Sequence, residues 1–115
     1  MIEYGHTLEM LIGGAVHLKQ VRKSELHFGD MVFIITQNSV YTVHVLGDEQ
    51  YLVSGGWFDR KKVAPKQTSI TGCTWGGNII KMDILAACGM RVEFGNRVVT
   101  TPIQHIIVTR LNSRN

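Results

Sequence analysis

The sequence predicts a single β-dominated α+β domain, residues 1–115, with antiparallel strands in a curved sheet or a small partly open barrel and one or two short helices. Three observations predict it. Residues 90–94 alternate between apolar and charged side chains, as strands of a half-buried sheet do. Residues 40–46 are rich in β-branched side chains, which favour strands. Glycines recur between such runs, where they mark turns, bends and bulges.

The first strands of the predicted sheet lie in the N-terminal half. One is expected at residues 31–36, directly after the turn residues Phe28-Gly29-Asp30. The next two form a hairpin from Val40 to Ser54, because Gly47-Asp48-Glu49 separates two apolar, strand-like runs.

A second hairpin is predicted at residues 90–94 and 97–101. Gly95-Asn96 would be its two-residue turn, with glycine supplying the positive φ that such turns need. In that register Phe94 faces Arg97 and Val92 faces Val99. The last strand is expected at residues 103–109, after a proline whose missing N–H costs least at a strand start.

Two segments leave the element type open. Residues 78–88 fit a helix capped by Asn78 and ended by Gly89, and this is the structure that we favour. Residues 80–84 of the same segment also alternate as a strand would. Residues 15–25 are a weaker helix candidate.

Composition and charge exclude several classes of protein. Hydrophobic residues make up 44% of the chain and charged residues 18%, which is typical of a globular domain and not of a disordered one. No apolar run reaches the roughly 20 residues of a membrane span, and the N-terminus has no basic region of a secretory signal. We therefore expect a cytoplasmic protein without a membrane partner, in which both cysteines are free thiols.

The net charge of +3 is unevenly distributed along the chain. Residues 1–58 carry three cations against six acids, whereas residues 59–115 carry nine cations against three acids. Halves of opposite sign allow self-association, unless the two halves interleave in space and the asymmetry cancels. Self-association is also favoured by apolar β-branched residues on both faces of the strand at residues 103–108, so we expect a homo-oligomer.

The sequence contains no motif for a metal or a cofactor, and neither is expected. Five histidines are present, but no two of them, and no pair of cysteines, has the close spacing of a metal site. The segment from Gly72 to Ile79 approaches the pattern of a phosphate-binding loop. It has Asn78 in place of the lysine and Ile79 in place of the hydroxyl residue, so nucleotide hydrolysis is not expected.

A thiol enzyme is one alternative that the residue types leave open. Cys73 lies between glycine and threonine in an expected loop, which makes it the candidate nucleophile, with His105 and Asp59 as partners. Cys88 ends an Ala-Ala-Cys run that is typical of a buried, structural thiol. Asp59 is the other residue on which an enzyme could depend, but the sequence favours a binding module over an enzyme.

The preferred hypothesis rests on the two tryptophans. Gly55-Gly56-Trp57 and Trp75-Gly76-Gly77 are near mirror images, and Asp59 and Arg60 follow the first. Glycines allow a close approach and tryptophan offers a broad apolar wall with one N–H donor. Trp57, Asp59, Arg60 and Trp75 are therefore the candidate site for a small molecule or a protein partner. The remaining alternative is that both tryptophans belong to the core.

A second binding hypothesis is a single-stranded nucleic-acid partner. Trp57 and Phe58 are followed by a cluster of cations, and such residues can stack bases and contact phosphates. The cations are Arg60, Lys61, Lys62 and Lys66. A lysine-rich segment after a strand is equally compatible with a solvated loop.

Three segments, SGGWFDRK, GCTWGG and EFGNRVVTTPIQ, resemble uncharacterised small bacterial proteins of the kind carried on mobile gene cassettes, such as integron cassettes. The resemblance covers residues 54–108. It implies a bacterial, cytoplasmic protein and a homo-oligomer. It implies no catalytic residues, because no activity is assigned to the proteins that it resembles.

Overall fold

The structure is a computed structural model that describes residues 15–77 and 79–110. Its strands, in chain order, are β1 (Val16–Leu18), β2 (Gln20–Arg22), β3 (Met31–Thr36), β4 (Val40–Gly47), β5 (Gln50–Gly55), β6 (Lys66–Thr68), β7 (Ile70–Thr74), β8 (Ile80–Lys81), β9 (Ile84–Ala87), β10 (Arg91–Phe94) and β11 (Ile103–Thr109). The helices are the 3-10 turn η1 (Lys23–Glu25) and the short α-helix α2 (Gly56–Arg60).

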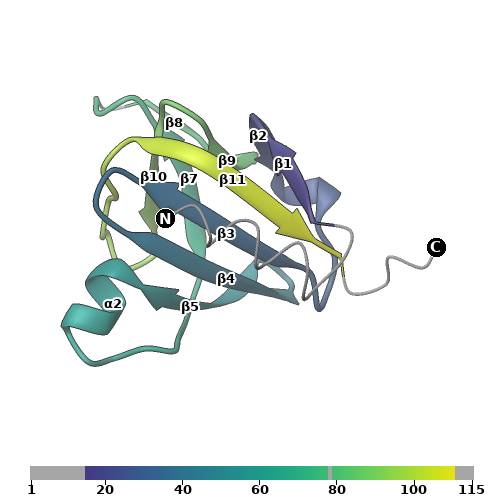
Figure 1. The fold of residues 1–115 in the computed structure, drawn as a ribbon, viewed down its shortest axis with the longest axis horizontal. Coiled ribbons are helices and arrows are strands. Elements are labelled where there is room, and N and C mark those ends of the chain that lie inside the picture. Colours follow the sequence, from purple (N-terminus) through teal and green to yellow (C-terminus); the bar gives the residue numbers. More distant parts are fainter. Residues whose placement is uncertain (1–14, 78, 111–115) are drawn as a thin grey trace.

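The strands form one large sheet and two small ones (Figure 1). The six-stranded sheet has the order β1-β11-β3-β4-β5-β6, and the small sheets are β10-β7-β8 and β2-β9. Every named strand pair is antiparallel, and the described strands do not close into a barrel. The predicted fold class, β-dominated α+β with antiparallel strands, is therefore confirmed.

The hydrophobic core lies between the inner face of the six-stranded sheet and the two small sheets. It includes an aromatic cluster in which Phe58 meets Phe94 edge-on, with ring centroids 5.0 Å apart, and Tyr41 lies 5.6 Å from Phe94. Such tilted and edge-on pairs are the favoured aromatic geometry. Because Phe58 comes from α2 and Phe94 from β10, the cluster joins the helix to the small sheet.

The predicted β4–β5 hairpin is present. Asp48 and Glu49 form its two-residue turn, both with positive φ (53° and 57°), and Gly47 before them has φ 98°. Two positive φ values are what a turn matching the right-handed twist of the flanking strands requires. The strands predicted at residues 31–36 and 103–109 are also confirmed, with the same bounds.

The second hairpin forms, but its turn and register differ from the prediction and residues 97–101 are not a regular strand. These residues fold back on β10 through hydrogen bonds from the Phe94 N–H to the Val98 carbonyl and from the Thr100 N–H to the Val92 carbonyl. An isolated bridge joins Glu93 to Val99, one residue away from the expected register, and the other edge of β10 pairs with β7. The turn is longer by one residue, because the Arg97 N–H donates to the Phe94 carbonyl and Arg97 itself adopts the positive φ of 70°. Gly95 has a different role: a Cβ there would collide with the Ser69 hydroxyl.

The helix favoured at residues 78–88 is also wrong, and its proposed cap, Asn78, lies outside the described residues. The segment forms β8 and β9 on either side of a turn at Met82 and Asp83. β8 pairs with β7 and β9 with β2, and all four residues of β9 are buried. Pairing with distant strands therefore decides the element. The alternating run at residues 80–84 is not one strand either, because the turn at Met82 and Asp83 divides it and Met82 is exposed. The weaker helix at residues 15–25 is replaced by β1, β2 and η1.

The two halves of the sequence interleave in space. β1 pairs with β11, β2 with β9, and β5 with β6, so several strands from the acidic half pair with strands from the basic half. The charge asymmetry along the sequence is therefore not a separation into two poles. In the described part of the chain, no helix has the length and apolar character needed to cross a membrane.

Candidate functional site

Trp57 lies on α2 and is half-buried against the core. Its indole packs edge-on against Phe58, with ring centroids 5.2 Å apart. The two glycines before it are needed by the chain itself. A Cβ on Gly55 (φ 98°) would collide with the Val40 carbonyl, and one on Gly56 (φ 46°) would collide with the Tyr41 ring. The Gly55-Gly56 pair thus admits neighbouring parts of the same chain rather than a ligand.

Asp59 and Arg60 differ in what they do. An Asp59 carboxylate oxygen (Oδ1) accepts a hydrogen bond from the buried Gly55 N–H at 2.9 Å and so closes the turn from β5 into α2. Arg60 is exposed at the end of the helix. Residues 56–60 are helical, and Asp59 stabilises the start of that helix.

Trp75 has a very different environment from Trp57. It directly follows β7 and is 68% exposed. Trp57 is instead connected to the other end of β7, the end that begins at Ile70. Its ring contacts Phe58, the Phe58 ring contacts Phe94, and Phe94 pairs with Ile70. Five residues of extended chain separate Ile70 from Trp75, about 16 Å at the usual rise of a strand. The structure therefore does not bring the two tryptophans together as the walls of one pocket.

Ile79 is the exposed neighbour of Trp75 that the sequence analysis did not single out. β7 and β8 pair with Thr74 opposite Ile80, so Trp75 directly follows the paired part of β7 and Ile79 directly precedes that of β8. The Trp75 ring lies near Gly89, 3.6 Å from the position of a Cβ there. Ile79 is 77% exposed. We call Trp75 and Ile79 together the β7–β8 tip. The other glycine pair, Gly76 and Gly77, is exposed within this connection, and a Cβ on Gly77 would meet nothing.

Cys73 does not lie in a loop, as expected, but within β7, where it is fully buried. Gly72 before it also lies in β7. It has to be a glycine, because a Cβ there would collide with the Lys81 carbonyl of β8. The Cys73 thiol donates to the Leu85 carbonyl at 3.5 Å. Burial raises the pKa of Cys73 to about 11, so the thiol is protonated at neutral pH. These properties do not fit a nucleophile.

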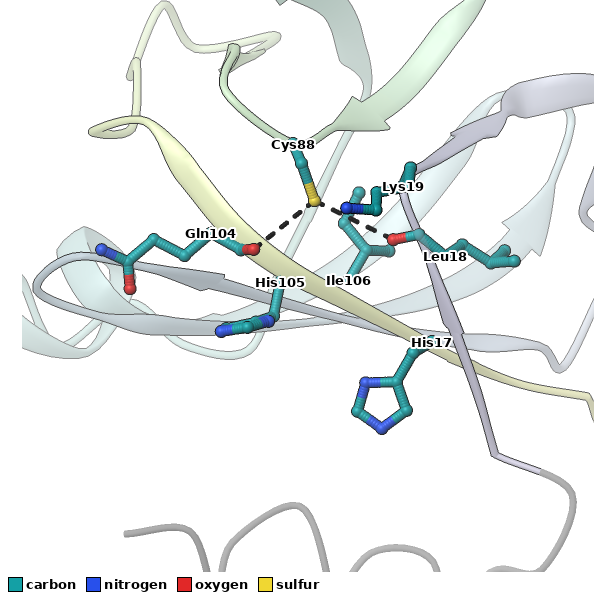
Figure 2. A pocket seen from close by; sticks show the side chains of 7 residues that line it. All are labelled: His17, Leu18, Lys19, Cys88, Gln104, His105 and Ile106. Atoms are coloured by element: carbon teal, nitrogen blue, oxygen red, sulfur yellow. Dashed lines mark hydrogen bonds between the residues drawn. The ribbon is translucent and has the colours of Figure 1, made fainter.

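Cys88, expected to be the buried thiol, is the more accessible of the two and lines a hollow of about 180 Å³. The other lining residues come from the β1–β2 junction and from β11: His17, Leu18, Lys19, Gln104, His105 and Ile106. Figure 2 shows Cys88 entering from the β9 side with its sulfur directed at the backbone of β11. The imidazoles of His17 and His105 lie on the other side of β11 in this view.

Two interruptions of regular pairing create this hollow. β1 leaves β11 after Leu18, and the chain then bends at Lys19 into β2, which pairs with β9. β11 has a bulge between Ile103 and His105. The carbonyl oxygens of Leu18 and Gln104 both face the Cys88 thiol, with O–Sγ distances of 3.9 and 3.5 Å. Bulges commonly redirect groups in this way beside functional sites.

A second hollow, of about 320 Å³, lies where η1 meets the β4–β5 hairpin and the β8–β9 turn. Lys23 is its central charge: its ammonium donates to the Thr71 carbonyl at 3.3 Å and lies 3.6 Å from a Glu49 carboxylate oxygen. Its backbone N–H donates to the Asp83 carbonyl. The lysine therefore joins three parts of the chain, and its charge is already balanced.

The described histidines, cysteines and acids include no group of three or more that could hold a metal ion. Comparisons of the chain with protein-family models, with curated proteins and with solved structures found no match in any of the three. The hollow at Cys88 carries no local sequence signal, because His17, Cys88 and His105 are far apart in sequence and meet only through the strand order.

Proposed function

We propose that the protein is a binding module whose partner is a protein, and that it self-associates through the β7–β8 tip. The observation that carries the proposal is the exposure of Trp75 (68%) and Ile79 (77%), which lie at the two ends of the connection between β7 and β8. Tryptophan is among the residues most enriched in the energetic centres of protein interfaces. An exposed tryptophan beside an exposed isoleucine, on a connection between paired strands, is suited to such a contact.

The energy available at the tip supports this proposal. A tryptophan side chain buries roughly 150–250 Å² when it is fully covered. With about two thirds of Trp75 exposed, its contact with a partner removes roughly 100–170 Å² from water, worth about 2.5–4 kcal/mol at ~25 cal/mol per Å². Ile79 adds about 1–2 kcal/mol on the same scale. In a two-fold dimer both copies contribute equally, which doubles the gain from one pair of residues.

Self-association is tested by analytical ultracentrifugation over a micromolar concentration series. We expect wild type to show a concentration-dependent dimer and the double variant Trp75→Ser/Ile79→Ser to stay monomeric. Phe28→Ser is the matched control, because Phe28 is 69% exposed at another place on the surface and its loss should leave the dimer intact. A wild type that is monomeric throughout, or equal weakening by the control, would contradict self-association through the tip.

A single-stranded nucleic acid is the second candidate partner, now through Trp75 rather than Trp57. Arg91 supports it, since its Nε lies 3.8 Å from the position of a Cβ on Gly76, next to Trp75. Lys81, opposite Cys73 on β8, is an exposed cation, whereas Arg91 is partly buried. Stacking of a base on Trp75 would quench its fluorescence on addition of single-stranded DNA at low salt, and added salt would reverse the effect. Absence of quenching at low salt would exclude this partner.

The two residues on which an enzyme would depend do not favour catalysis. Cys73 is buried and protonated at neutral pH, and Asp59 accepts the Gly55 N–H. His105, the proposed base, lines the hollow at Cys88 instead. These observations support a binding module over a thiol enzyme.

A further inference from the structure

We propose that the outer face of the six-stranded sheet is a docking surface for residues 1–14 of the same chain, which lie across this face and cover it. The outer face is the side of the sheet that is turned away from the core cluster. The proposal is independent of the β7–β8 tip. It rests on two apolar side chains, Phe33 and Ile107, that are buried on this face although they do not belong to the core cluster.

Phe33 and Ile107 point away from the core because side chains alternate along a strand. Phe33 lies between two core residues of β3, Val32 and Ile34, and Ile107 likewise lies between two core residues of β11. The two are directly opposite each other in the β3–β11 register. Phe33 is only 6% exposed and Ile107 only 1% exposed, yet neither belongs to the core cluster. The outer face therefore has a buried apolar centre of its own.

The strands beside this pair do not account for its burial. β1 places His17 next to Ile107, and β4 places Thr42 next to Phe33, so the pair lies in the interior of the sheet. In Figure 2 the outer face is the side of β11 on which the His17 and His105 imidazoles lie. Side chains on neighbouring strands stand next to one another and leave the top of the face open. A further layer of chain on this face is therefore needed to bury the pair.

The described elements outside the large sheet lie on its other side. β2, α2, β7, β9 and β10 each contribute buried residues to the core cluster, among them Val21, Phe58, Ile70, Leu85 and Val92. β8 pairs with β7, and η1 is followed directly by Leu26, another member of the cluster. Of the helices and strands within residues 15–77 and 79–110, none is therefore available to cover the outer face.

Residues 1–14 join the sheet at a suitable place and are long enough to cover the pair. They lead into β1, whose residue His17 is opposite Ile107, so the segment enters the sheet beside the buried pair. The distance from β1 across β11 and β3 to β4 is three strand spacings, about 14 Å. Fourteen residues span about 21 Å at the rise of an α-helix and more when extended. The segment can therefore cross the pair in either conformation.

The segment also has the composition that an apolar face requires. Its large apolar residues include Tyr4, Leu8 and Leu11, whose spacing is that of residues on one side of a helix, with Glu9 on the other side. The opposite end of the chain, residues 111–115, contains a single large apolar residue. The pair is buried within one copy of the chain, so a second copy is not needed to cover it. Residues 1–14 are therefore the occupant that fits this face.

The first test is a set of nuclear Overhauser measurements on the full chain, with the Phe33 ring and the Ile107 methyl groups as reporters. We expect both reporters to show contacts with protons of Tyr4, Leu8 or Leu11. A mixture of isotope-labelled and unlabelled protein distinguishes contacts within one copy from contacts between copies. No contact with residues 1–14, or contacts only between copies, would overturn the proposal. Trp75→Ser/Ile79→Ser should leave the contacts unchanged, which separates this proposal from self-association through the tip.

The second test removes apolar side chains from the segment. Leu8→Ser/Leu11→Ser should lower Tm by about 5–10 °C, because two apolar side chains lose their contacts with the sheet. The fluorescence of added 8-anilinonaphthalene-1-sulfonate should rise at least about two-fold, since this dye binds exposed apolar surface. Glu3→Ser/Glu9→Ser is the matched control in the same segment and should change Tm by less than about 2 °C.

Equal effects of the two double variants on Tm and on dye fluorescence would refute the docking of the apolar side of the segment. If Leu8→Ser/Leu11→Ser does not fold, Leu11→Ala replaces it. The Overhauser measurements on wild type decide without either variant.

Discussion

Asp59→Ala tests whether this carboxylate stabilises the fold or serves a binding site. The change removes the acceptor that lies 2.9 Å from the Gly55 nitrogen and leaves a buried N–H without its partner. A hydrogen bond to a charged group contributes about 1.5–3 kcal/mol, and the exposure of Asp59 lowers this, because water competes for the carboxylate. We therefore expect a loss of about 1–2 kcal/mol in the free energy of unfolding, equivalent to about 4–8 °C in Tm.

The stability of wild type, Asp59→Ala, Arg60→Ala and Asp59→Asn is measured by urea titration and by thermal melting. Arg60→Ala, one residue along α2 and exposed, should change the free energy of unfolding by no more than about 0.5 kcal/mol. Asp59→Asn retains an oxygen acceptor and should fall between wild type and Asp59→Ala. Equal effects of Asp59→Ala and Arg60→Ala would refute the stabilising role. If Asp59→Ala leaves the free energy of unfolding unchanged but abolishes partner binding, Asp59 contributes to a binding site and not to the stability of the fold.

Two further predictions concern the core. Phe58→Ala should lower the free energy of unfolding by about 3–5 kcal/mol, because it leaves a cavity at the centre of the aromatic cluster; a loss below about 1 kcal/mol in a urea titration would show that the cluster is not packed as described. Burial raises the Cys73 pKa from 9.0 to about 11, so the thiolate forms first in the unfolded chain. The stability that protonated Cys73 provides is complete below pH 9 and is lost as the pH rises through 11, by about 2–3 kcal/mol in total. Denaturation from pH 8 to 11 should show this loss in wild type and a smaller one in Cys73→Ala; parallel profiles would contradict it.

The strands that sequence analysis located correctly are those with complete local signals. β4 and β5 alternate across a turn that begins at Gly47, where the backbone needs positive φ at three successive residues. β3 and β11 are apolar, β-branched runs that begin after turn residues or proline, and they pair along their lengths in the centre of the sheet. For these segments the residues themselves contain the information that fixes the element and its bounds.

The segments that were predicted incorrectly depend on distant partners. β8 and β9 have the composition of a helix, with Leu85, Ala86 and Ala87 in succession, yet they are strands because β7 and β2 supply open edges on which they pair. In the second hairpin, Arg97 takes the positive φ, and the expected turn residue Gly95 is instead kept small by Ser69. Local propensity cannot reveal either effect, since the deciding atoms come from elsewhere in the chain.

The two glycine–tryptophan motifs show the same limit at the candidate site. Their mirror-image pattern suggested one shared pocket, but the two glycine pairs have unrelated functions. Gly55 and Gly56 make room for the Val40 carbonyl and the Tyr41 ring, so Trp57 begins a helix that packs on the core. Gly77 admits no neighbouring group, and Trp75 ends a strand in an exposed position. A close approach occurs only at the first glycine pair, and it is the packing of the rest of the chain that distinguishes the two pairs. Trp57 therefore packs on the core, and Trp75 is the exposed tryptophan.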